Sequence, residues 1–340
     1  MSKNSSGVSV VVCCYNSATR LPKTLEHLAK QQNAQAINWE VIIVDNNSTD
    51  DTTVVAQHEW AKWELSVPVR VVAEPQAGLT YARRKGVQES KYDFVLFCDD
   101  DNWLCATYVA DVYDILSKDG AIGALGGWGE PVYEQIPEDW FLEGNFCKRM
   151  ATGPQGDQAG DITKSRGYVY GAGMAMPRSL VWHLFTTKTH YLKDRMGKLL
   201  TGGGDMELCY LAQLEGYKIW YSDKLRFFHF MPVNRTIPDY LTKLSRGKAY
   251  SSVLLKPYEI VLRGETLMNK NLIWLRLLLP KLKHYLKSLR ANPSASTLEI
   301  IRKKMSRESN TGFITSLLKH NFAIDRMVKE LRDHLNQIKN

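Results

Sequence analysis

The first hundred residues alternate between short apolar runs and helix-length amphipathic segments, and this alternation restricts the fold more than any other feature. Four near-continuous apolar runs predict buried strands, in the segments "VSVVVCCYN", "WEVIIVD", "VRVVAEP" and "YDFVLFCDDD". Strands that are apolar on both sides belong to parallel sheets whose two faces are covered by helices. We therefore predict an α/β fold with a Rossmann-like, mostly parallel sheet.

Polar side chains follow these runs where each predicted strand ends. Asn16, Asp45, Glu74 and the acids at 99–101 occupy these positions. Open α/β sheets bind ligands beyond the carboxyl ends of their strands, so we expect these side chains to line one crevice. A solvated polar turn would also accommodate three consecutive acids. The further acids at neighbouring strand ends instead favour a hard cation, Mg²⁺ or Mn²⁺, which would relieve the mutual repulsion.

The basic residues are concentrated near the C-terminus. Residues 264–340 contain 15 Lys and Arg against 6 Asp and Glu, a net charge of +9 within a total of +8. The segment "NKNLIWLRLLLPKLKHYLKSLR" reads as a basic amphipathic helix. Such a helix can lie on an anionic membrane surface, or it can pack its Leu face on the rest of the protein, and both readings stay open. No nucleic-acid-binding motif accompanies the charge, so nucleic acid is not an expected partner.

The remaining composition is that of a cytoplasmic protein. The N-terminus has only a brief apolar run, so we expect no signal peptide, and no segment is long and apolar enough to span a membrane. The six cysteines show no regular spacing, which predicts reduced thiols. With the basic segment, this predicts a cytoplasmic location, including a peripheral position at the inner face of the cell membrane.

Five segments together resemble family 2 glycosyltransferases, which have the GT-A fold. They are "VSVVVCCYNSATRLPKTLEHL", "EVIIVDNNSTDDT", "AEPQAGLTYARRKGV", "FVLFCDDDN" and "GGGDMELCYLAQLEGYKIWYSDKLRFFHF", in the family's order over residues 8–235. The resemblance implies a catalytic domain at 1–237, with a donor half to about 103 and an acceptor half from about 104. A basic helical region would follow at 238–340.

The resemblance also implies which residues bind a nucleotide-sugar donor, with UDP as the expected nucleotide. Asp45 matches the acid that contacts uracil and ribose, and we expect Ser48 or Thr49 to cap the helix that follows it. Arg83 matches a basic residue near the donor, in preference to its neighbours Arg84 and Lys85. The other implied donor-binding residues are Tyr15, Asn16, Glu74, Asp99 and Gly173.

The implied metal ligands for Mn²⁺ or Mg²⁺ are Asp99, Asp101 and His229, with Asp100 in a supporting role. A lone His beside aromatic residues is more often a packed core residue, so His229 depends on the resemblance. Relatives carry Gly-Glu-Asp where this chain has "GGGD", so Asp205 is the expected general base and Glu207 the second choice. Asp205 could instead merely cap its helix.

The implied reaction is an inverting single displacement, in which Asp205 deprotonates a hydroxyl of a glycan, lipid-linked or other acceptor. One alternative is a glycan- or nucleotide-binding protein of this fold without turnover, which the "GGGD" departure keeps open. A sugar-1-phosphate nucleotidyltransferase would need a Gly-rich loop after the first strand, and a dinucleotide oxidoreductase would need G-x-G-x-x-G there. The segment "CCYNSATRLPKT" has neither.

Overall fold

The computed structural model describes residues 5–34, 36–192, 194, 200–265, 273–289 and 295–339. Their contacts divide the chain into two compact units. The first unit comprises 1–132, 148–190 and 216–231, and the second 133–147, 191–215 and 232–340. The expected domain boundary after residue 237 coincides with the start of helix α8 at Pro238. The contacts, however, group 133–147 and 191–215 with the helical region.

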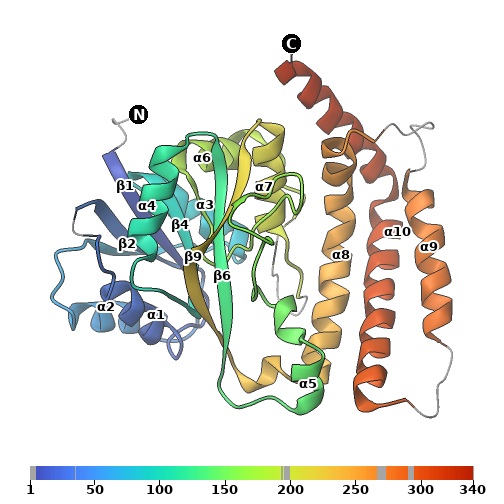
Figure 1. Ribbon diagram of the computed structural model, residues 1–340, viewed down its shortest axis with the longest axis horizontal. Coiled ribbons are helices and arrows are strands. Elements are labelled where there is room, and N and C mark those ends of the chain that lie inside the picture. Colours follow the sequence, from blue (N-terminus) through green and yellow to red (C-terminus); the bar gives the residue numbers. More distant parts are fainter. Residues whose placement is uncertain are drawn as a thin grey trace. The chain divides into compact units, whose positions relative to one another are not determined.

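The first unit is built on a mixed sheet. Its parallel part has the order β3-β2-β1-β4 and is formed by β1 (Ser5–Cys14), β2 (Asn38–Asp45), β3 (Val69–Ala73) and β4 (Tyr92–Asp99). The four predicted strands are thus confirmed as a parallel sheet (Figure 1). The order continues with β8 (Ala175–Pro177), β6 (Ile122–Tyr133), β9 (Lys218–Met231) and β5 (Asn102–Leu104), and β7 (Gly160–Asp161) pairs with β9. The pairings of β8 with β4 and β6, and of β9 with β5 and β7, are antiparallel.

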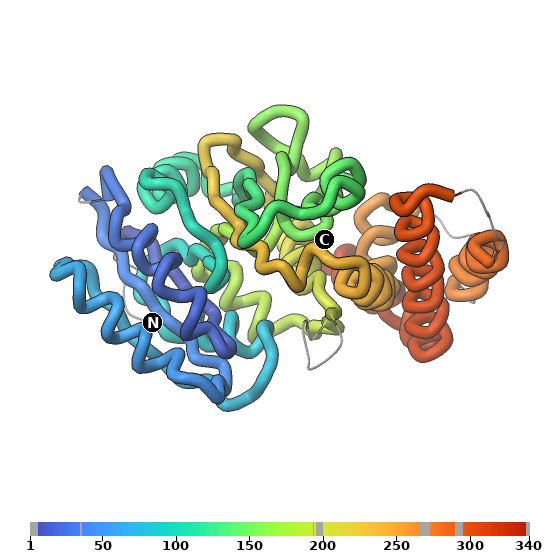
Figure 2. Tube along the Cα trace, turned by 90° about the horizontal axis from the view of Figure 1, so that it is seen from below, coloured from blue at the N-terminus to red at the C-terminus, as the bar shows by residue number. Residues whose placement is uncertain are grey.

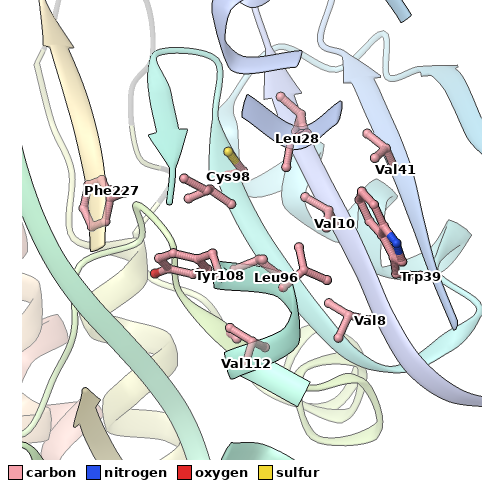
Figure 3. Close-up of a cluster of buried hydrophobic side chains, with 14 of the residues drawn as sticks. Val8, Val10, Leu28, Trp39, Val41, Leu96, Cys98, Tyr108, Val112 and Phe227 are labelled. Atoms are coloured by element: carbon pink, nitrogen blue, oxygen red, sulfur yellow. The ribbon is translucent and has the colours of Figure 1, made fainter. Parts of the chain in front are cut away.

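Helices cover both faces of the parallel strands, as the apolar runs require. One face packs against α1 (Leu21–Ala29), α2 (Thr52–Ala61) and α4 (Tyr108–Lys118). Figure 3 shows side chains of this core, including Val8, Val10, Leu28, Leu96, Tyr108 and Val112.

The opposite face packs against α3 (Leu79–Glu89), which also contacts α6 (Arg178–Thr187). Gly86 on α3 lies so close to Val11 of β1 that a Cβ atom there would collide with the valine side chain. The absence of a side chain at this position therefore sets the distance between helix and sheet.

The second unit is helical. It contains α5 (Asp139–Glu143), α7 (Gly204–Leu214), α8 (Pro238–Leu262), α9 (Ile273–Ser288) and α10 (Thr297–Lys339). A 3-10 helix at Phe146–Arg149 follows α5 in the chain. Helix α10 lies between α8 and α9, in both views (Figures 1 and 2).

Candidate functional site

Strand register brings the candidate donor-binding residues to one edge of the sheet. Cys14 pairs with Asp45, and Cys13 pairs with Asp99, so the carboxyl ends of β1, β2 and β4 are level. The amide of Glu74, directly after β3, donates to the Asp45 carbonyl at 2.9 Å. The expected crevice residues on four strands therefore do meet at this edge.

Asp45 is held in place by the turn that follows it. Its carboxylate accepts from the Ser48 amide at 3.0 Å and from the Thr53 hydroxyl at 2.7 Å. Burial alone would raise the pKa of Asp45, but these hydrogen bonds outweigh it and lower the pKa below its usual value. The carboxylate is therefore ionised and fixed at neutral pH, as an acceptor for ribose or base groups must be.

The expectation that Ser48 or Thr49 caps the next helix is wrong. Helix α2 begins at Thr52, and the Thr52 amide donates to the Asp50 carboxylate at 3.1 Å. Ser48 and Thr49 instead join the loops after β1 and β2: the Ser48 hydroxyl accepts from the Asn16 amide at 3.1 Å, and the Thr49 amide donates to the Asn16 side chain at 2.8 Å.

These contacts fix the loop that carries Tyr15 and Asn16. Asn16 has a φ of 49°, a left-handed conformation that Asn tolerates better than most residues. The Tyr15 side chain is 57% exposed at the same edge of the sheet. An exposed aromatic ring on an anchored loop can stack on a nucleotide base.

Asn46 is a site residue that the sequence did not reveal. Its buried side chain donates to the carbonyls of Glu74 at 3.0 Å and Gln76 at 2.7 Å, and accepts from the Gly78 amide at 2.8 Å. It thereby connects the end of β2 to the loop before α3. An Asn directly after a strand-ending Asp is a recognisable signal, but its partners lie about thirty residues away and cannot be read from spacing.

Arg83 is buried on α3, with its guanidinium carbon 5.6 Å from the centre of the Phe97 ring. Burial raises the pKa of the Cys13 thiol to about 12, and the positive charge of Arg83 partly opposes this increase. Arg83 therefore exerts its charge at the end of β1, beside the strand that carries Asp99. Arg84 is exposed, as expected of a solvated helix face.

Two of the three consecutive acids, Asp100 and Asp101, have different surroundings. Asp100 faces the segment just before α1, where its carboxylate accepts from the Ser17 hydroxyl and from Arg20 Nη2 at 2.6 Å. Burial and the neighbouring Asp101 raise the pKa of Asp100 to about 6, against the opposing effects of Arg20 and Ser17. Arg20 is the partner that sequence reasoning missed, and the supporting role of Asp100 stays a prediction.

Asp101 faces β9 instead. Antiparallel pairing of β5 with β9 sets Asn102 opposite His229, and the His229 Nε2 atom lies 3.5 Å from Asp101 Oδ1. Both side chains are buried, and the Asn102 amide group donates to Asp101 at 3.2 Å. His229 lies within a strand, yet its ring nitrogen is directed at a carboxylate, so it is more than a packed aromatic.

The donor set at this place suits a divalent cation that also binds a ligand. Within the described residues, no three His, Cys, Asp or Glu side chains converge in an arrangement that would hold a metal by themselves. One carboxylate and one imidazole 3.5 Å apart nevertheless fit Mn²⁺ or Mg²⁺, since such ions bind one or two protein ligands and complete their shells with phosphate oxygens and water.

Gly173 has a structural requirement of its own. Its φ is 72°, and a Cβ atom there would collide with the Tyr108 hydroxyl, which donates to the Gly173 carbonyl at 2.8 Å. Packing alone explains the glycine, so its role near a donor sugar stays a prediction.

The two candidate bases lie on α7, in the second unit, and have unlike surroundings. Asp205 is half-buried in the first turn. Glu207 is buried, and its carboxylate accepts from the Tyr191 amide at 2.8 Å, the Leu192 amide at 3.3 Å and the Tyr258 hydroxyl at 3.0 Å. Three such bonds are typical of an anchoring group, so Asp205 is the better candidate for the base.

The start of α7 is held by the side chain of a residue ten positions earlier in the chain. Gly203 is the N-cap residue, with a φ of 115°, so Asp205 does not occupy that position. The Gly204 amide donates to the Asp194 carboxylate at 2.7 Å, and a Cβ atom on Gly204 would collide with that carboxylate. Gly204 and Asp194 are therefore a matched pair that sequence reasoning did not find.

Comparison with known proteins shows which protein family this chain matches. Residues 9–185, more than half of the chain, match the family model described as glycosyl transferase family 2. A curated relative is poly(ribitol-phosphate) beta-N-acetylglucosaminyltransferase TarP of Staphylococcus aureus, which is 24% identical over 142 residues, 42% of each protein. The chain spans only 28%, 30% and 42% of the lengths of three such relatives.

Two solved structures share the architecture. TarS of S. aureus, in complex with UDP-GlcNAc, is 16% identical, with 90% of each chain covered and a TM-score of 0.51. The mannosyltransferase PcManGT of Pyrobaculum calidifontis, in complex with GDP-Man and Mn²⁺, is 14% identical, with 99% of this chain and 87% of that chain covered and a TM-score of 0.51. At these identities the likeness shows the fold, and it confirms the GT-A fold predicted from the sequence.

Proposed function

Because the chain belongs to glycosyl transferase family 2, we propose that it transfers a sugar from a nucleoside diphosphate donor to a hydroxyl group of a glycan or lipid-linked acceptor. The observation that carries this proposal is the meeting of Asp45, Asp99 and the Asp101–His229 pair at the carboxyl edge of one sheet. The sugar donors of the two solved neighbours, UDP-GlcNAc and GDP-Man, support a donor of this class.

The nucleotide would bind at the ends of β1 to β3. Asp45, kept ionised by its hydrogen bonds, accepts from ribose or base groups, and the exposed Tyr15 ring stacks on the base. Arg83 contributes positive charge near the diphosphate. UDP is the nucleotide we propose, since both TarS and the family pattern of an acid at Asp45 point to uridine.

Asp101 and His229 would hold Mn²⁺ or Mg²⁺, with Asp99 on the ribose or a metal-bound water. When bound, such an ion neutralises negative charge on the diphosphate leaving group. Mn²⁺ accompanies the donor in PcManGT, which supports a divalent cation here.

The second unit would supply the base. Asp205 takes the proton of the acceptor hydroxyl as its oxygen forms a bond to the anomeric carbon. The bond from that carbon to the diphosphate breaks, its electron pair leaves with the nucleotide, and the configuration inverts.

Calorimetric titration with UDP and with GDP, each with and without Mn²⁺, tests the donor site. We expect UDP to bind only with Mn²⁺, and Asp101→Asn to weaken binding at least about tenfold, because a carboxylate ligand is lost. Lys118→Gln, an exposed change on α4, is the control that leaves affinity unchanged. Equal UDP binding with and without metal would contradict the metal site, and stronger GDP binding would correct the nucleotide.

A product-release assay with a panel of UDP-sugars then separates transfer from mere binding. We expect Asp205→Asn to reduce turnover at least about 100-fold, the usual size of general-base catalysis. Tight donor binding by the unaltered protein with no transfer to any offered acceptor, and no slow donor hydrolysis, would favour a binding protein without turnover.

A further inference from the structure

Helix α9 has one side packed and one side open. Its packed side lies against α10: Ile273 is buried, the Trp274 ring meets Phe322 at 6.4 Å, and Lys281 lies 4.7 Å from the centre of the Phe313 ring. Because α10 separates α9 from α8, no described helix covers the other side of α9 (Figure 2).

The open side presents a stripe of leucines. Leu279, Leu282 and Leu286, with Leu289 in the turn after the helix, are 67%, 38%, 63% and 51% exposed. Their spacings of three, four and three residues align them along one line of the helix surface. Single exposed leucines are ordinary, but four in one stripe form a patch that signals an interaction site.

Basic side chains of α9 border this stripe, and no acid of the described part of α9 does. Arg276, Lys283 and Lys287 are exposed beside the leucines, and residues 273–289 contain no Asp or Glu. Arg290 and the residues before Ile273, which belong to the predicted basic segment, lie outside the described residues. This charge belongs to a basic part of the chain, since residues 264–340, α9 included, carry a net +9.

We propose that the outer face of α9 docks on a lipid bilayer that contains anionic lipids. The leucine stripe would enter the boundary between headgroups and acyl chains, while Arg276, Lys283 and Lys287 would contact lipid phosphates. Among the described residues, no helix has the length and apolar character needed to cross a bilayer. The helix therefore lies along the surface, and this inference does not depend on the proposed transferase activity.

Charge decides between a membrane and a second copy of this helix. A leucine stripe with heptad-like spacing could form a coiled coil, but coiled coils pair opposite charges along the borders of the seam. Two copies of α9 would bring Arg276, Lys283 and Lys287 against their own equivalents with no acid on α9 to pair them. An anionic lipid surface satisfies both the leucines and the basic border.

Vesicle flotation with the full chain tests the proposal. We expect binding to vesicles of phosphatidylcholine with about 30% phosphatidylglycerol and at least tenfold weaker binding to phosphatidylcholine alone. Lys283→Gln/Lys287→Gln should weaken binding about 25-fold, since each basic residue near the surface contributes about fivefold. Leu279→Gln/Leu286→Gln should weaken it at least about tenfold, because both side chains would leave the apolar layer.

Two control variants remove leucine-like and basic side chains from the surface of the first unit. Val54→Gln/Leu65→Gln deletes two exposed apolar side chains of the first unit, and Lys62→Gln/Lys118→Gln deletes two exposed charges there. Both should bind vesicles as the unaltered protein does. Absence of binding to the anionic vesicles, or equal losses in the controls, would overturn the proposal.

Sedimentation of the same variants without lipid addresses the competing partner. A dimer that Leu279→Gln/Leu286→Gln converts to a monomer, with no vesicle binding, would show that α9 pairs with a second copy and would overturn the membrane assignment. Donor titration on the same samples keeps the two proposals separate, because none of these substitutions touches the donor-site residues.

Discussion

Asp100 lies between two acids proposed to face the ligands, yet its own carboxylate faces the segment just before the first helix. Arg20 and Ser17 bind that carboxylate in a buried setting, where its pKa is raised to about 6. At neutral pH the ionised Asp100 carboxylate is therefore stabilised by the positive charge of Arg20. In this way one of three adjacent negative charges is neutralised by the protein itself, and Asp99 and Asp101 are the two acids proposed to bind the metal and the donor.

Arg20→Leu should lower the free energy of unfolding by about 2 kcal/mol or more, because it leaves a buried carboxylate without its cation. Urea unfolding at pH 7.5 measures this. Lys23→Gln breaks an exposed pair with Glu26 on the same helix and should cost less than about 1 kcal/mol. Adding Asp100→Asn to Arg20→Leu should recover part of the loss, and equal losses for Arg20→Leu and Lys23→Gln would contradict the assignment.

Glu207→Gln tests whether this buried acid is structural. The amide group cannot accept from all three donors, so we expect a loss of about 1 to 3 kcal/mol in the free energy of unfolding. Asp205→Asn, two residues away and half-buried, should change stability far less. A Glu207→Gln protein of unaltered stability but without turnover would reverse the roles of the two acids.

At the scale of an element, the start of α7 depends on a glycine and an acid that fit one another. Asp194 accepts from the Gly204 amide and fills the space that a side chain at 204 would need. The first turn of α7, which carries Asp205, is thus positioned by a residue ten positions earlier. A side chain at position 204, as in the Gly-Glu-Asp pattern, has no room beside the Asp194 carboxylate.

Gly204→Ala should therefore destabilise the protein by about 1 to 3 kcal/mol through the clash with Asp194, although alanine favours helix by about 1 kcal/mol. Gly202→Ala is the matched control, since a Cβ atom at Gly202 meets nothing within 4 Å. Thermal unfolding compares the two. Equal stability of both variants would show that the 194 segment moves aside without cost.

Sequence patterns predicted elements better than they predicted side-chain partners. The four apolar runs specify β1 to β4 because both faces of those strands are buried, and the polar residues after them follow from strand polarity. The short strands β5 and β8 have no such run. Their places depend on antiparallel pairing with strands 80 to 130 residues away, which is also what brings His229 to Asp101. Arg20, Asn46 and Asp194 were missed because their partners are set by how the loops fold, which leaves no pattern in the sequence.

At the scale of the whole molecule, the candidate residues divide between the two units. Nine of the eleven, from Tyr15 to His229, belong to the first unit, and Asp205 and Glu207 belong to the second. The residues proposed for donor binding and the residue proposed for proton transfer thus belong to separate parts of the chain.

This division predicts that the two activities can be lost independently. Asp205→Asn should bind UDP with Mn²⁺ within about twofold of the unaltered protein, since no donor ligand is removed, while turnover falls at least about 100-fold. Asp101→Asn should lose both. Calorimetry and product release on the same preparations give the comparison, and a loss of UDP affinity in Asp205→Asn would contradict it.

Because the carboxyl ends of β1, β2 and β4 are aligned, an error in strand register would affect the core and the candidate site together. A slip of one residue in the pairing of β1 with β4 would turn every side chain of a strand to the opposite face. It would place Ser9 and Val11, from the other buried face of β1, where Val10 and Val12 now pack, and it would offset the ends of β1 and β4 by one residue. A chain with this shifted register would therefore lose both its core packing and the alignment of its acidic residues. Misfolded molecules should therefore be fully inactive and not partly active. The fraction of activity lost under stress should then equal the fraction of molecules that are unfolded.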